Sequence, residues 1–85
     1  MQLPMINLNG TSREALLEQQ CNAISYLRKA IQMLQQAAPN GRDYTPQGTP
    51  EGTAAYGRAA AEHRDRLDRL QSVMSELETI GEHLA

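Results

Sequence analysis

Apolar and small side chains recur along two long segments of this 85-residue chain, in alternating steps of three and four residues. This spacing places them on one side of an α-helix and is typical of a helix that packs lengthwise against a neighbour. The first segment carries the pattern at Leu17, Gln20, Ile24, Leu27, Ile31, Leu34 and Ala38, and the second at Tyr56, Ala60, His63, Leu67, Leu70, Met74, Leu77, Gly81 and Leu84. One loop rich in glycine and proline separates the segments. The sequence therefore predicts an all-α fold of two long antiparallel helices, an αα-hairpin whose two seams face each other.

Capping residues indicate where the first helix begins. Asn9-Gly10 is a turn signal, and the run from Thr11 to Glu14 fits a capping box, in which a hydroxyl caps one backbone amide and the glutamate reaches back to another. We expect the first helix to start at Thr11 or Ser12. The preceding residues, 1–10, are too short and too interrupted for a helix but strongly apolar, which predicts an N-terminal arm that packs on the hairpin.

Prolines set the other boundaries of the hairpin, which spans residues 11–85. Pro39 ends the first helix because proline lacks a backbone donor and disfavours helical angles in the residue before it. Thr49, Pro50 and Glu51 have the order of an N-cap, a first-turn proline and a first-turn acid. These signals predict helices over about 11–38 and about 50–84, joined by a loop over 39–49.

Folding the chain about this loop predicts a register for the two seams. It sets Leu34 near Tyr56, Leu27 near His63 and Gln20 near Leu70, so the second helix extends about two turns beyond the first. The extension leaves three apolar residues uncovered at the carboxyl end, namely Leu77, Ile80 and Leu84. We expect either the N-terminal arm or a partner chain to cover them.

The apolar stripe on each helix is broader than one seam. Leu16, Ala23, Ala30 and Ala37 widen it on the first helix, and Ala59, Val73 and Ile80 widen it on the second. A broad stripe indicates that a helix contacts more than one neighbour, as in a coiled-coil-like bundle of four or more helices. The chain is also small and has a single cysteine, so no internal disulfide can stabilise it. These features predict a homo-oligomer, either a dimer or a higher assembly.

Charge and composition exclude several classes of function. The formal net charge is −2 and only one of the eight basic residues is a lysine, so binding to nucleic acid is not expected. No apolar run is long enough for a membrane span, and residues 1–8 lack the features of a signal peptide. We therefore expect a protein of the reducing cytoplasm with no membrane association.

Residues able to carry chemistry are few. Neither paired cysteines nor a Glu-x-x-His spacing is present to indicate a metal site, and local spacing brings no nucleophile, base and orienting group together. The sequence thus predicts a protein that is not an enzyme and holds no cofactor. His63 lies on the second seam, which predicts a structural role and leaves a proton switch as the alternative. Cys21 is expected to be a small buried hydrophobic residue, and His83 to be exposed.

The loop is the most distinctive segment of the chain. It is longer than the links of about 2 to 8 residues that usually join helices in bundles. Arg42 and Asp43 supply charge, Tyr44 a stacking surface with a hydroxyl group, and Gln47 a side-chain amide. Two interpretations remain open: a site for a ligand or partner, or an ordered turn in which Tyr44 closes the end of the bundle.

Two further arginines are candidates for the same site. In an antiparallel pairing of two hairpins, the loop of one chain lies beside the first helix start of the other. That arrangement would bring Arg13 of one copy toward Arg42 and Tyr44 of another, in an inter-chain pocket suited to an anion. Arg58, early in the second helix, would contribute from the same chain as the loop.

Three stretches of the chain support a resemblance. These are Leu8-Asn9-Gly10-Thr11-Ser12, the loop residues Pro39-Asn40-Gly41-Arg42-Asp43-Tyr44 with Pro46-Gln47-Gly48, and Glu62-His63-Arg64. In them the chain resembles small helical-hairpin proteins encoded by bacteriophages and prophages. The resemblance implies a bacterial host cytoplasm and carries no activity and no functional residue.

Two functions are compatible with these observations. We expect an oligomeric binding protein that engages a protein partner, such as a host protein, through its loop end. The alternative is a sponge of the anti-defence type that sequesters a small phosphorylated or nucleotide ligand in pockets between chains.

Overall fold

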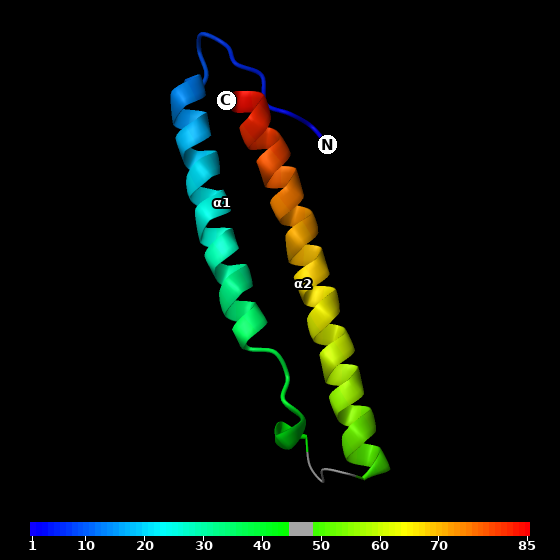
Figure 1. The fold of residues 1–85 in the computed structure, drawn as a ribbon. Coiled ribbons are helices and arrows are strands. Elements are labelled where there is room, and N and C mark those ends of the chain that lie inside the picture. Colours follow the sequence, from blue (N-terminus) through cyan, green and yellow to red (C-terminus); the bar gives the residue numbers. More distant parts are fainter. Residues whose placement is uncertain (45–48) are drawn as a thin grey trace.

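The fold is an all-helical hairpin, as the two seams predict. A computed structural model describes residues 1–44 and 49–85. Helix α1 spans Arg13–Gln36, a short 3-10 helix η1 spans Gly41–Asp43, and helix α2 spans Pro50–Leu84. The two long helices pack side by side in opposite directions, with both termini at one end of the hairpin and the loop at the other (Figure 1).

The two long helices begin at side-chain caps. The Ser12 hydroxyl oxygen accepts a hydrogen bond from the Ala15 amide at 3.2 Å, and the Thr49 hydroxyl oxygen accepts one from the Gly52 amide at 3.1 Å. Each cap satisfies an amide that has no partner within its helix. The predicted capping box based on Thr11 is not formed, because Ser12 is the cap and Glu14 consequently lies one position too early.

The core of the hairpin is a single narrow seam. Its buried apolar side chains in the described residues are Ile31, Met74 and Leu84, which are 8%, 8% and 2% exposed. His63 is buried in the same seam at 7% exposure. Apart from Tyr56, which is exposed, the other large seam residues are half-buried, because one neighbouring helix covers only one side of a helix surface. The hairpin therefore has one layer of contacts and no second layer beneath it.

The register of the two helices differs from the predicted one. The Gln20 side-chain amide donates to the Leu77 carbonyl oxygen at 3.0 Å, so Gln20 lies beside Leu77 and not beside Leu70. At the same end, the Arg13 guanidinium donates to the Leu84 carbonyl oxygen at 3.3 Å. Helix α1 is thus displaced by about two turns toward the carboxyl end of α2, since seven residues of helix span roughly 10 Å.

The displaced register moves the unpaired part of α2 to the opposite end. The prediction that Leu77, Ile80 and Leu84 remain uncovered by α1 is wrong: Leu84 is the most buried large side chain, and the other two residues are half-buried. Instead, α2 extends beyond the end of α1 on the loop side, where η1 lies against it (Figure 1). The loop is long because part of it runs beside α2 and covers the turns that α1 does not reach.

The N-terminal arm contacts the end of α2 through a few residues only. Leu3 and Pro4 are half-buried, and a ring nitrogen of His83, Nε2, lies 2.9 Å from the Pro4 carbonyl oxygen. His83 is exposed, as expected, and this hydrogen bond ties the arm to the last turn of α2. The rest of the arm projects into solvent, with Met5 82% exposed and Leu8 103% exposed.

The molecule is markedly elongated. Its principal extents are 64, 21 and 17 Å, and its radius of gyration is 19.1 Å. A compact chain of this length would have a radius of gyration of about 12 Å. Neither helix, over the residues that are described, has an apolar stretch long enough to cross a membrane.

Truncating the most buried side chain tests the observed register. We expect Leu84→Ala to lower the free energy of unfolding by about 2 to 5 kcal/mol, because it removes a side chain that is 2% exposed and leaves a cavity. The matched control Leu8→Ala changes a leucine that is fully exposed and should alter stability by less than about 0.5 kcal/mol. Urea denaturation followed by circular dichroism measures both. Equal effects of the two substitutions would contradict the placement of Leu84 under α1 and the arm.

Candidate functional site

The loop end has its own local structure. The Asn40 side-chain oxygen accepts a hydrogen bond from the Arg42 amide at 3.1 Å, and the Asn40 carbonyl oxygen accepts one from the Asp43 amide at 3.0 Å. The Tyr44 amide donates to the Gly41 carbonyl oxygen at 3.2 Å. These bonds fold residues 40–44 into one turn of 3-10 helix, from which the side chain of Tyr44 emerges next to α2.

A surface groove lies between this turn and α2. Its volume is about 310 Å³, and we name it the loop-end groove. The residues that line it are Pro39, Tyr44, Ala55, Arg58, Ala59, Glu62 and Arg66. The groove therefore brings together two of the six predicted site residues, Tyr44 and Arg58. Pro39 closes it on the side where α1 ends.

The two aromatic residues at the loop end are neighbours. The rings of Tyr44 and Tyr56 have centroids 6.2 Å apart and planes inclined by 55°. This tilted geometry lies within the range in which aromatic pairs attract each other. Tyr44 is half-buried and Tyr56 is 39% exposed, so the pair supports the end of the hairpin and still presents aromatic surface to solvent.

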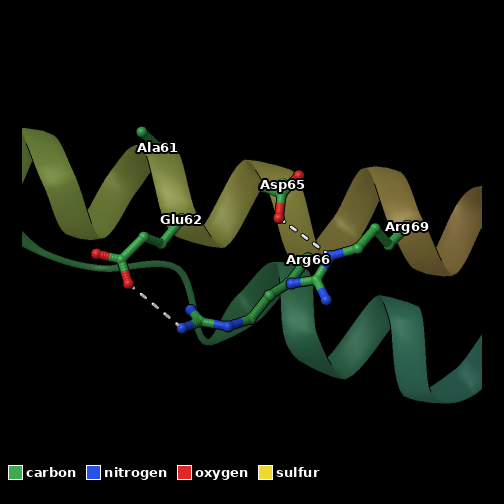
Figure 2. A pocket seen from close by; sticks show the side chains of 5 residues that line it. All are labelled: Ala61, Glu62, Asp65, Arg66 and Arg69. Atoms are coloured by element: carbon green, nitrogen blue, oxygen red, sulfur yellow. Dashed lines mark ion pairs between the residues drawn. The ribbon is translucent and has the colours of Figure 1, made fainter.

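Carboxylates neutralise most of the basic charge next to the groove. Arg66 lies 3.6 Å from Glu62, and Arg69 lies 3.0 Å from Asp65 (Figure 2). Both ion pairs join residues four apart on one helix, and both are more than half exposed, so each contributes only about 0.3 to 0.5 kcal/mol. Figure 2 shows the Arg66 side chain extending from α2 toward the end of α1. Arg58 has no ion-pair partner among the described residues.

The remaining predicted site residues are not brought into the groove of the same chain. Arg42 and Asp43 are exposed on η1 and do not line the groove. Arg13 lies at the opposite end of the hairpin, where its guanidinium donates to the end of α2. Gln47 falls outside the described residues.

Sequence reasoning missed two charged residues of the groove, Glu62 and Arg66. Their place in the same groove as Pro39 and Tyr44 depends on the loop running beside α2, which follows from the register and not from any local pattern. The one signal in the sequence was the unusual length of the loop.

Polar burial in the seam is concentrated at His63. Its Nε2 atom is inaccessible to solvent and has no hydrogen-bond partner among the described residues. Leu34 shares a shallow groove with Arg66 and Leu70, so this part of α2 lies beside the last turns of α1. A buried polar atom without a partner lowers the free energy of unfolding by about 1 to 3 kcal/mol, so His63 destabilises the isolated hairpin.

A second groove lies near the termini, on the other side of the seam from the charged pairs. It has a volume of about 410 Å³ and is lined by Leu17, Cys21, Ile24, Arg28, Glu78, Gly81, Glu82 and Ala85. The two helices lie close together at Gly81, where an added Cβ atom would be 3.5 Å from the Cδ1 methyl group of Ile24. Cys21 is exposed here, and the prediction that it is buried is wrong because α2 covers α1 only along the adjoining seam positions.

Metal ligands do not converge anywhere in the described parts of the chain. No group of three or more histidine, cysteine, aspartate or glutamate residues in 1–44 and 49–85 is placed to hold a metal ion.

Comparison with known proteins finds no matching family model, no matching curated protein and no matching solved structure. The groove and its side chains are therefore the basis for any functional assignment.

Replacing the buried histidine tests whether its ring is an unpaired group. We expect His63→Leu to raise the free energy of unfolding by about 1 to 3 kcal/mol, because a leucine fills the seam without a polar atom to desolvate. His83→Leu is the matched control, since that ring is exposed and bonded to Pro4, and it should give no increase. Urea denaturation measures both changes. A loss of stability in His63→Leu would contradict the expectation that removing an unpaired buried ring nitrogen stabilises the chain.

Proposed function

We propose that this chain is a non-enzymatic, self-associating binding protein that engages a protein partner through the loop-end groove. The observation that carries the proposal is the groove itself, in which Tyr44 and the unpaired Arg58 lie beside a mixed set of charges. Self-association supplies the second contact layer that one hairpin lacks. The groove supplies the recognition surface.

Surface area supports self-association. The hairpin exposes 6347 Å², whereas a compact monomer of 9.4 kDa would expose about 5,000 Å². The excess of about 1,300 Å² is larger than the roughly 800 Å² that each partner buries in a standard interface. Three of the exposed large apolar residues lie on the long helices outside the loop-end groove: Tyr26, Met33 and Val73.

The chemistry of the loop end favours a protein partner. Tyrosine and arginine are the residue types enriched at the centres of protein interfaces, and both are present where α2 extends beyond α1. An amphipathic groove flanked by both signs of charge suits a partner surface that offers donors, acceptors and a carboxylate for Arg58. The groove is open and shallow, which also suits a protein surface more than an enclosed small molecule.

A small anionic ligand is the second candidate, and the presence of Arg58 and Arg66 in one groove is the observation that favours it. Within one chain its support is weaker, because Glu62 pairs with Arg66 and leaves Arg58 as the one unpaired cation of the groove. Arg13 and Arg42 of neighbouring copies would have to add charge. A role in the phage life cycle, in the cytoplasm of a bacterial host, follows from the resemblance described above and belongs to the same proposal.

Substitutions at the groove test partner binding. The full chain is immobilised and used to capture proteins from a bacterial lysate, alongside the variants Tyr44→Ala and Arg58→Glu. We expect a protein that the wild type retains to bind each variant at least about thirtyfold more weakly, which corresponds to a loss of 2 kcal/mol or more at an interface centre. The control Arg64→Glu changes an exposed arginine of α2 outside the groove and should bind normally. Equal retention by all four proteins would contradict the proposed site.

A nucleotide panel separates the two candidates. Thermal unfolding of the full chain is measured with and without mononucleotides and cyclic dinucleotides. A ligand present at 100 times its dissociation constant adds about 2.7 kcal/mol to native stability. We expect no such stabilisation. An increase of that size, abolished by Arg58→Glu and kept by Arg64→Glu, would replace the protein partner with a small anionic ligand.

A further inference from the structure

The outer surface of α1 carries a second seam that no part of this chain covers. Ala23, Tyr26, Ala30, Met33 and Ala37 follow one another in steps of three and four residues, which is the spacing of a helix that packs against another helix. All five are exposed in the hairpin, with Tyr26 77% and Met33 49% exposed. We name these residues the outer seam. Helix α2 cannot cover them, because it occupies the adjoining side of α1, where Ile31 is buried.

We propose that a second copy of this chain docks on the outer seam, so that the α1 helices of two copies pack against each other in antiparallel orientation about a two-fold axis. The assignment rests on the self-association proposed above and names the surface and the orientation. The occupant is another copy, because the hairpin has more surface to bury than a standard dimer requires and the outer seam is complementary to itself.

Self-complementarity comes from the alternation of small and large side chains. Along the outer seam the residues alternate between alanine and a large side chain, with Tyr26 and Met33 each lying between two alanines. In an antiparallel pair, Tyr26 of one copy is level with Ala30 of the other, and Met33 is level with Ala23. Each large side chain then meets an alanine, which fills the layers evenly.

Parallel pairing would fill the same surface badly. It would place alanine opposite alanine and tyrosine opposite tyrosine, leaving some layers empty and others crowded. In the antiparallel pair, the two-fold axis makes each contact between a large side chain and an alanine occur twice, once from each copy. On the solvent side of the outer seam the flanking charged residue is Lys29, which is exposed and can keep its ammonium group in water. On the other side, Arg66 and Arg69 of α2 lie next to Leu34.

The orientation has a consequence for the loop-end groove. An antiparallel pair of α1 helices places the loop of one copy level with the start of α1 in the other. The two grooves of the dimer then lie at opposite ends, and each is near Arg13 of the neighbouring copy. A partner bound at the groove could therefore contact both chains.

Sedimentation equilibrium of the full chain tests the surface. We expect the wild type to sediment as a dimer or a multiple of a dimer of the 9.4 kDa chain, and Ala30→Glu to raise the dimer dissociation constant at least tenfold. The control Ala61→Glu places the same side chain on an exposed position of α2 outside the outer seam and should leave the dissociation constant unchanged. Circular dichroism confirms that both variants remain helical.

Disulfide formation tests the orientation. In a Cys21→Ser background, the double variant Ala23→Cys/Met33→Cys should form inter-chain disulfides under mild oxidation, because the two positions are level in the antiparallel pair. The single variant Met33→Cys should not, since its symmetry mate lies about ten residues, or roughly 15 Å, away along the helix. Disulfide-linked dimers of the single variant would overturn the antiparallel register.

The outcomes separate this assignment from the proposed function. An associated wild type with an unchanged dissociation constant in Ala30→Glu, or with equal weakening in Ala61→Glu, overturns the outer seam and leaves self-association standing. A wild type that sediments as a monomer at micromolar concentration overturns both.

Discussion

The packing of one helix against one other helix is the interaction on which the whole structure depends. A helix surface has room for several neighbours, and here a single neighbour covers a narrow strip of each. Three apolar side chains and one histidine are therefore the only large side chains that become buried in the described residues. Burying a core of this size stabilises the fold by little more than the conformational entropy lost in ordering the chain costs. The apolar surface that remains exposed therefore matters for the stability of the molecule.

Hydrogen bonds from polar side chains to backbone carbonyls define the register of this seam. Gln20 bonds the Leu77 carbonyl within the seam, and Arg13 bonds the Leu84 carbonyl at the end of α2. The second bond places a cation at a helix carboxyl terminus that is otherwise crowded by acidic side chains, which is the favourable orientation relative to the helix dipole. Apolar side chains at three-four spacing can slide by seven residues and still meet. These polar contacts distinguish one alignment from the next.

The sequence was sufficient for the helices and insufficient for their alignment. Seam spacing, Pro39 and the Thr49-Pro50 pair predicted the fold class and the helix limits to within two residues, because those signals are local. The two-turn error in register arose because loop length alone does not reveal whether a loop folds back beside a helix. Arg58 was expected beside Tyr44 because it lies early in the second helix of the same chain as the loop, and both residues do line one groove. The participation of Glu62 and Arg66 depends on the register and could not be predicted. Burial of Cys21 was overestimated because the seam is narrower than its pattern of small residues indicated.

The placement of the chain ends has a practical consequence. The N-terminal arm and the end of α2 lie together at the end of the hairpin farthest from η1 (Figure 1). The hydrogen bond between His83 and the Pro4 carbonyl holds the arm there. A fluorophore, affinity handle or fused domain attached at either terminus would consequently sit tens of ångströms from Tyr44 and Arg58, because the rod is 64 Å long. That separation holds within one hairpin. In the antiparallel pair proposed above, the same attachment would lie level with the loop-end groove of the neighbouring copy and would report on assembly.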